Sequence, residues 1–151
     1  MNALGRILLV EDDAKDIDLT LGALEDYNLA NEVVVVRDGA EALDYLHARG
    51  NYGSRARENP AVVLLDLKLP KVDGLEVLRE IRSDERLKLI PVVVLTSSHE
   101  ERDMVASYRL GVNAYVVKPV EFHAFVNAVK ELGVFWAVIN EPPPGSVAGR
   151  K

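Results

Sequence analysis

Acidic residues follow two apolar runs of the sequence at the point where each run ends. Glu11, Asp12 and Asp13 come directly after one run, and Asp66 comes directly after another. Carboxylates that lie close together repel one another and raise one another's pKa unless a cation offsets them. Because no histidine or cysteine accompanies them, these oxygen ligands favour a hard cation, Mg²⁺ or Mn²⁺. The sequence therefore predicts a divalent metal site.

Two other strand-end residues carry the groups that a phosphoryl group needs around it. Lys118 provides an ammonium and Thr96 provides a hydroxyl, and each comes directly after an apolar run. A metal ion would neutralise the charge on a transferring phosphoryl group, while the ammonium and hydroxyl would take its remaining oxygens. Asp66 would then be the nucleophile. The pattern predicts phosphoryl transfer to a carboxylate.

Each of these residues alone has a simpler explanation. The acidic residues 11–13 could merely cap a helix, because acidic side chains favour the start of any helix. Asp66 alone fits a turn, Lys118 fits a solvated turn residue, and Thr96 fits hydrogen bonding at a strand end. Their joint placement at the ends of apolar runs is what favours a common site.

The apolar runs alternate with segments of helical periodicity. Their continuous apolar character is typical of parallel strands that are covered on both faces. The predicted strands are residues 7–10, 33–36, 62–65, 92–95 and 115–117, and the predicted helices are residues 16–27, 39–49, 74–83, 100–110 and 121–138. This order predicts an α/β fold with a doubly wound five-stranded parallel sheet. In such a sheet the functional crevice lies at the carboxyl ends of the strands.

Three segments depart from this regular pattern. The fourth predicted helix has a weak apolar stripe at positions 104, 105, 108 and 110, so it should be less firmly anchored. Residues 50–60 are rich in turn formers and should be exposed, with Arg55 and Arg57 solvated. We expect the domain to span residues 1–140, followed by a proline- and glycine-rich tail over 141–151 with no effector domain.

The composition excludes several classes of function. The chain of 151 residues has no cysteine, which excludes disulfides, thiolate metal sites and cysteine nucleophiles. Its net charge is -6 and its basic residues form no run, so a nucleic-acid partner is not expected. The first apolar run is too short for a signal peptide or membrane span, which predicts a cytoplasmic protein. His47, His99 and His123 share no spacing, and we assign them no role.

Four motifs in order resemble the signature of the response-regulator receiver family. They are LLVEDD at 8–13, LLDLKLP at 64–70 with Asp73-Gly74, VLTS at 94–97 and YVVKP at 115–119. The resemblance covers nearly the whole chain. It implies the flavodoxin-like (βα)5 fold with strand order 2-1-3-4-5. It also implies a signalling protein rather than an enzyme, one that accepts a phosphoryl group from a sensor histidine kinase.

The resemblance assigns the metal-binding roles residue by residue. It implies that Asp66 is the phosphorylated residue and that Asp12 contacts Mg²⁺ directly. Glu11 would act on the metal through water, and Lys68 would contribute its backbone carbonyl. Glu11 stands where many members of the family have aspartate, a substitution that remains compatible with metal binding.

The resemblance also assigns the residues that respond to phosphorylation. Lys118 would bind the phosphoryl group, with a cis peptide bond before Pro119. Thr96 would move to donate a hydrogen bond to a phosphoryl oxygen, and Tyr115 would turn inward with it. The fourth helix and the neighbouring surface would then shift in population.

Within this family, three features are similar to regulators paired with bacterial phytochrome kinases. They are the insertion at 52–60, the turn at 96–98 and the aromatic pair at 135–136. This similarity implies a red-light signalling partner and a homodimer formed through the fourth helix, fifth strand and fifth helix. The apolar surface of the last predicted helix would support such a dimer.

Other functions compatible with the fold fit the residues less well. A flavin-binding protein needs a phosphate-cradling loop after the first strand, but that loop is acidic here. An aspartate-nucleophile phosphatase needs an acid two residues after the nucleophile, where this chain has Lys68. Three alternatives remain within the family: a phosphate sink, a phosphorelay intermediate, or a scaffold that is not phosphorylated.

Overall fold

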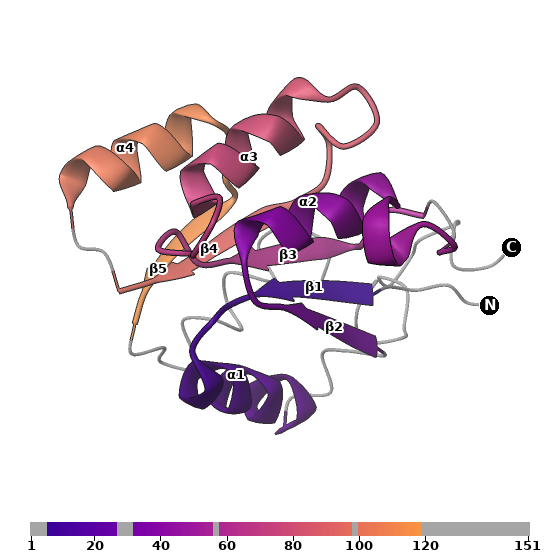
Figure 1. Cartoon of the computed structure of the whole chain (residues 1–151). Helices are drawn as coiled ribbons and strands as arrows, with labels where there is room; N and C mark the ends of the chain where they lie inside the picture. Colours follow the sequence, from indigo (N-terminus) through magenta and orange to yellow (C-terminus); the bar gives the residue numbers. More distant parts are fainter. Residues whose placement is uncertain (1–5, 27–31, 56–57, 98–99, 119–151) are drawn as a thin grey trace, which may run out of the picture.

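The computed structural model describes residues 6–26, 32–55, 58–97 and 100–118, and these residues form an α/β fold around one parallel sheet (Figure 1). The strands are β1 (Arg6–Val10), β2 (Glu32–Val36), β3 (Val62–Leu65), β4 (Val92–Thr96) and β5 (Ala114–Val117). Their order in the sheet is β2-β1-β3-β4-β5. The predicted fold class and strand order are therefore confirmed.

The helices of the described residues cover both faces of this sheet. They are α1 (Ala14–Asp26), α2 (Gly39–His47), α3 (Gly74–Ser83) and α4 (Glu101–Arg109), with a short 3-10 helix, η1 (Gly50–Tyr52). Figure 1 shows α2, α3 and α4 on one face and α1 on the other. The predicted helix at 121–138 and the tail at 141–151 lie outside the described residues. None of the described helices is both long and apolar enough to cross a membrane.

The continuous apolar runs are explained by two cores, one on each side of the sheet. Successive side chains of a strand point to opposite faces. In β1, Leu8 and Val10 belong to the core beneath α2 and α3, whereas Ile7 and Leu9 belong to the core that α1 covers. A strand with both faces buried must be apolar at every position.

The α4 helix exposes part of the apolar stripe that the sequence predicted for it. Val105 and Tyr108 are 40% and 51% exposed, whereas Asp103 and Ser107 are buried. Residues 103 and 107 lie one helical turn apart and share the inner face. The predicted inner face is therefore wrong at Val105 and Tyr108, because polar residues occupy the side that faces the sheet.

Most of the described residues in the segment after α2 are exposed, as predicted, but Tyr52 and Arg55 pack against that helix. The guanidinium of Arg55 lies 4.0 Å from the centre of the Tyr45 ring, and its Nε donates to the Tyr45 carbonyl oxygen at 2.8 Å. The hydroxyl of Tyr52 donates to Glu41 at 2.6 Å. The expectation that Arg55 is solvated is therefore wrong, because its planar fork can stack on a ring and donate to a carbonyl together. Arg57 lies outside the described residues.

Candidate functional site

Hydrogen bonding continues one residue beyond three strands and carries the candidate site residues to a common edge. The N–H of Asp66 donates to the last carbonyl of β1 at 3.1 Å, and the N–H of Glu11 donates to the last carbonyl of β2 at 3.0 Å. The N–H of Lys118 donates to the Thr96 carbonyl at the end of β4, at 2.8 Å. Because the strands are parallel, these residues meet at the carboxyl edge of the sheet.

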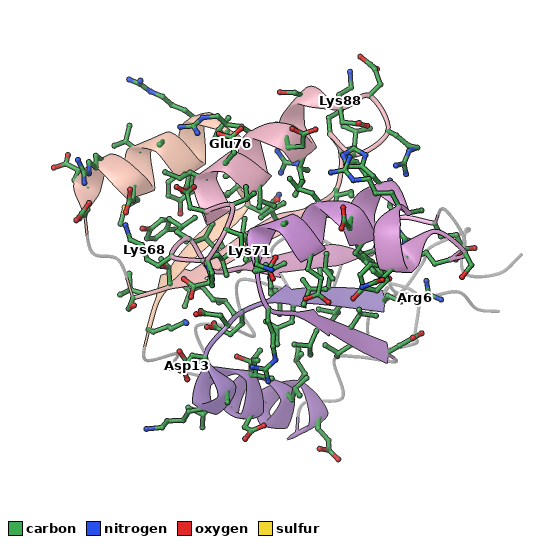
Figure 2. All side chains as sticks on the ribbon, in the orientation of Figure 1. Arg6, Asp13, Lys68, Lys71, Glu76 and Lys88 are labelled. Carbon is green, nitrogen blue, oxygen red and sulfur yellow. The ribbon has the colours of Figure 1, made fainter. Side chains whose placement is uncertain are left out.

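The loops after β1 and β3 reach the same edge. Figure 2 shows Asp13 and Lys68 at this edge, whereas Arg6 lies at the opposite end of the sheet. Gly74 opens α3 directly against the phosphoacceptor candidate: a Cβ atom there would lie 2.2 Å from the backbone oxygen of Asp66. Only a residue without a side chain lets α3 begin so close to Asp66.

Three of the predicted metal ligands lie together at this edge. Glu11, Asp12 and Asp66 each offer an oxygen atom, and these atoms all lie within 4.8 Å of one another. Glu11 and Asp66 are buried, while Asp12 is exposed and gives the group access to solvent. Asp13 lies outside the group, and its Oδ1 accepts the Asp16 N–H at 3.0 Å, so capping of α1 explains this residue.

The ammonium of Lys118 lies between three carboxylates. Its Nζ donates to Glu11 at 2.7 Å, to Asp16 at 2.9 Å and to Asp66 at 3.3 Å. Only 11% of the lysine side chain is exposed. Each of the three ammonium protons therefore has a carboxylate acceptor. The motifs predicted Lys118 beside Asp66 but did not identify Asp16, whose only sequence signal is an acidic position in the first turn of a predicted helix.

The charges at this edge are unbalanced. Burial raises the pKa of Glu11 to about 7, and the Asp66 charge adds to this effect although the hydrogen bond from Lys118 opposes it. Burial would lower the pKa of Lys118, but hydrogen bonds to Glu11 and Asp16 and the Asp66 charge outweigh it, so the net shift is upward. One ammonium thus faces the carboxylates of Glu11, Asp16 and Asp66, and the Asp12 carboxylate lies close to two of these three. An excess of negative charge around two buried carboxylates, with oxygen-only donors, fits a divalent cation.

The remaining predicted residues lie around this group in different ways. Lys68 donates its N–H to Asp66 Oδ1 at 3.3 Å, while its Nζ lies 3.4 Å from Asp103 on α4. Thr96 closes β4 and is fully buried. Tyr115 lies further back in β5, is half-buried and has its ring 6.5 Å from that of Tyr108. The predicted cis peptide bond before Pro119 lies outside the described residues.

The histidines do not contribute to the acidic group in the part of the chain that the structure describes. His47 lies at the end of α2, with Nε2 3.6 Å from Glu80 and Nδ1 3.9 Å from Asp84. His99 and His123 lie outside the described residues. His47 therefore faces acidic residues of α3 and its C-terminal end and not the acidic group at the carboxyl edge.

Several known proteins are similar to this chain in both sequence and fold. The family model described as "Response regulator receiver domain" matches residues 7–130. Response regulator Rcp1 of Synechocystis sp. (strain ATCC 27184 / PCC 6803 / Kazusa) is 44% identical over 130 residues, which cover 86% of this chain and 87% of Rcp1.

Two solved structures extend this similarity. The bacteriophytochrome response regulator RtBRR is 65% identical with a TM-score of 0.83, and the match covers 97% of this chain and 89% of RtBRR. The Mn²⁺-bound form of Rcp1 is 42% identical with a TM-score of 0.74, and the match covers 88% and 94% of the two chains. The similarity therefore extends over nearly the whole length of each protein.

Proposed function

Because the chain belongs to the response-regulator receiver family, we propose that it is a signalling protein in which Asp66 accepts a phosphoryl group from a sensor histidine kinase. The observation that carries this proposal is the convergence of the Lys118 ammonium and two further acidic residues on the buried Asp66 carboxylate. An oxygen of Asp66 attacks phosphorus, the phosphorus–nitrogen bond of the phosphohistidine breaks, and its electron pair stays on the leaving imidazole.

The acidic group would hold Mg²⁺ through Glu11, Asp12, Asp66 and the backbone carbonyl of Lys68. When bound, the ion supplies charge neutralisation at the transferring phosphoryl group. The carboxylates draw it to the edge of the sheet, and the exposure of Asp12 leaves an entry path from solvent. The Mn²⁺-bound structure of Rcp1 supports a divalent ion in this family.

A pair of neighbouring substitutions tests the metal site. Asp12→Asn should weaken Mg²⁺ binding by roughly tenfold or more, because it removes a charged ligand. Asp13→Asn is the matched control: asparagine caps a helix as well as aspartate does, and residue 13 lies outside the group. Calorimetric titration measures both affinities. Equal losses in the two variants would contradict the assignment of Asp12.

After transfer, Lys118 and Thr96 would hold the phosphoryl oxygens, and Tyr115 would follow Thr96. The buried position of Thr96 at the end of β4, where the strand reaches the carboxyl edge, supports this role. The contact between the Tyr115 and Tyr108 rings offers a route from β5 to α4. The switch is a change in the population of α4 positions.

Treatment with acetyl phosphate and Mg²⁺, followed by intact-mass measurement, tests this function. The wild-type protein should gain the mass of one phosphoryl group, and Asp66→Asn should gain none. Asp18→Asn removes one carboxylate from the exposed face of α1 and should be modified like the wild type. An unmodified wild type, or an Asp66→Asn protein modified to the same extent, would refute the proposal.

We further propose that the kinase partner is a bacterial phytochrome, because RtBRR is a bacteriophytochrome response regulator and is 65% identical to this chain. Phosphotransfer from a purified phytochrome kinase should be at least tenfold faster than from a sensor kinase of another input class. Equal rates from the two kinases would contradict this pairing. If the phosphorylated chain then passes its phosphoryl group to a phosphotransfer protein, it acts as a phosphorelay intermediate or a phosphate sink.

We also propose a homodimer formed through α4, β5 and the predicted fifth helix. The exposed side chains of Val105 and Tyr108 support this surface, since they leave apolar area on α4 next to β5.

The proposed domain boundary at residue 140 is compatible with the family match, which ends at residue 130.

A further inference from the structure

The ammonium of Lys118 is shared with a carboxylate that does not belong to the metal-binding group. Asp16 lies 2.9 Å from Lys118 Nζ, closer than Asp66 at 3.3 Å. The group of carboxylates that could hold a metal ion contains Glu11, Asp12 and Asp66 but not Asp16. Asp16 therefore contacts the site through the lysine.

The place of Asp16 in the first turn of α1 does not account for its contact with Lys118. The capping contact of that helix comes from Asp13, whose carboxylate accepts the backbone N–H of Asp16. The Asp16 carboxylate instead meets a lysine 102 positions away in the sequence. Its side chain is 32% exposed, so water competes only partly for this contact.

The other two partners of the ammonium change during the proposed reaction. Glu11 would face the metal ion, and Asp66 would become an acyl phosphate. Asp16 would remain a carboxylate beside Lys118 that neither belongs to the metal-binding group nor accepts the phosphoryl group. The ammonium has three protons, and any proton donated to Asp16 is withheld from the phosphoryl oxygens.

We propose that Asp16 is a positioning residue for Lys118, which competes with the phosphoryl group for the ammonium and thereby weakens the hold of the site on that group. The inference rests on the proposed function, since it concerns the same phosphorylated site. The negative charge of Asp16 also opposes the approach of an anionic donor. Removing the charge should thus strengthen binding of a phosphoryl group or its mimic.

The affinity for beryllium fluoride, an anionic mimic of the phosphoryl group, tests this inference at saturating Mg²⁺. Backbone amide NMR follows the titration. Asp16→Asn keeps the size of the side chain and should bind the mimic about two- to fivefold more tightly, the range expected for a partly exposed ion pair. Asp16→Glu restores the charge and should return affinity toward the wild-type value. Asp18→Asn, an equal charge change on the same helix, should match the wild type.

Acetyl phosphate supplies a second readout that a structural defect would not produce. In Asp16→Asn the donor concentration for half-maximal rate should fall by a similar factor, with the maximal rate little changed. If Asp16→Asn does not fold, Asp16→Ser, which is also small and polar, provides the same comparison.

The outcomes separate the two proposals. A wild-type protein that binds no beryllium fluoride refutes the proposed function itself. A wild type that binds it, with Asp16→Asn equal to the wild type or weaker, overturns only the role of Asp16. If Asp18→Asn raised the affinity for beryllium fluoride as much as Asp16→Asn does, net charge alone would explain the effect. That result would also overturn the role of Asp16.

Discussion

Glu11 is a buried carboxylate whose negative charge is only partly offset in the metal-free protein. Its pKa, raised from 4.5 to about 7, means that the folded state binds a proton more tightly than the unfolded chain does. The stability that this proton contributes is fully present below about pH 4.5 and is lost as the pH rises through 7. Above this pH, the proposed metal ligand Glu11 therefore costs stability when no cation offsets its charge.

Glu11→Gln should therefore stabilise the metal-free protein at pH 8, by about 1–3 kcal/mol, and should change its stability little at pH 5. Glutamine keeps an acceptor for Lys118 but carries no charge to desolvate. Urea unfolding with a chelator at the two pH values measures the effect. A variant that is less stable than the wild type at pH 8 would show that Glu11 is fully compensated by Lys118.

Single residues were predictable from the sequence where a motif marked them. The strand-end positions of Glu11, Asp66 and Lys118 follow from apolar runs and parallel pairing, so their convergence could be predicted. Asp16 and Arg55 could not be assigned in the same way. Each acts through a partner that is chosen by tertiary packing, and nothing in the local sequence identifies that partner.

Gly74 is the point at which α3 meets the backbone of the loop that carries Asp66. A Cβ atom there would lie 2.2 Å from the Asp66 oxygen and 2.5 Å from Leu67 Cα, both backbone atoms that cannot move cheaply. Gly74→Ala should lower the free energy of unfolding by about 1–3 kcal/mol, the usual cost of overpacking. Gly22→Ala in α1 is the matched control, since a Cβ atom there has nothing within 4 Å.

Gly22→Ala should raise stability by roughly 0.5–1 kcal/mol, because alanine loses less conformational entropy in a helix than glycine. Denaturant unfolding compares the two variants with the wild type. If both alanines change stability in the same direction, close contact with the Asp66 backbone is not what requires glycine at position 74.

The helices α3 and α4 should differ in local stability. Three apolar residues of α3, Val77, Leu78 and Ile81, are fully buried, whereas α4 buries Asp103 and Ser107. A hollow of about 440 Å³ lies between the first turn of α3 and α4 and is lined in part by Leu75 and Asp103. Amide hydrogen exchange should therefore be faster in α4 than in α3. Equal protection in the two helices would remove the basis for α4 as the moving element.

Elements were predictable to the extent that their apolar pattern was strong. The five strands begin and end within one residue of the predicted limits, because buried parallel strands require continuous apolar runs. The α4 helix was predicted, but its inner face was not. With few apolar residues to fix its rotation, polar contacts such as that between Lys68 and Asp103 decide which side faces the sheet.

At the scale of the whole molecule, the sheet separates two cores and leaves the functional edge open at one end. The face carrying α4 also exposes Val105 and Tyr108, which is the surface that we propose for a homodimer. Light scattering should give a dimer for the wild type, and Tyr108→Ala should weaken its association at least about tenfold, as loss of a central aromatic contact does. Leu19→Ala, on the exposed side of α1, is the control and should remain dimeric. A wild type that is monomeric with and without phosphorylation would contradict the dimer.

The central claim is that Asp66 itself carries the phosphoryl group, and borohydride trapping tests it most directly. Borohydride reduces an aspartyl phosphate to homoserine, so peptide mass analysis after phosphorylation identifies the modified position. We predict homoserine at position 66 that requires both the phosphodonor and Mg²⁺. Homoserine at position 12, 13 or 16, or none at all in protein that has gained a phosphoryl group, would contradict the assignment.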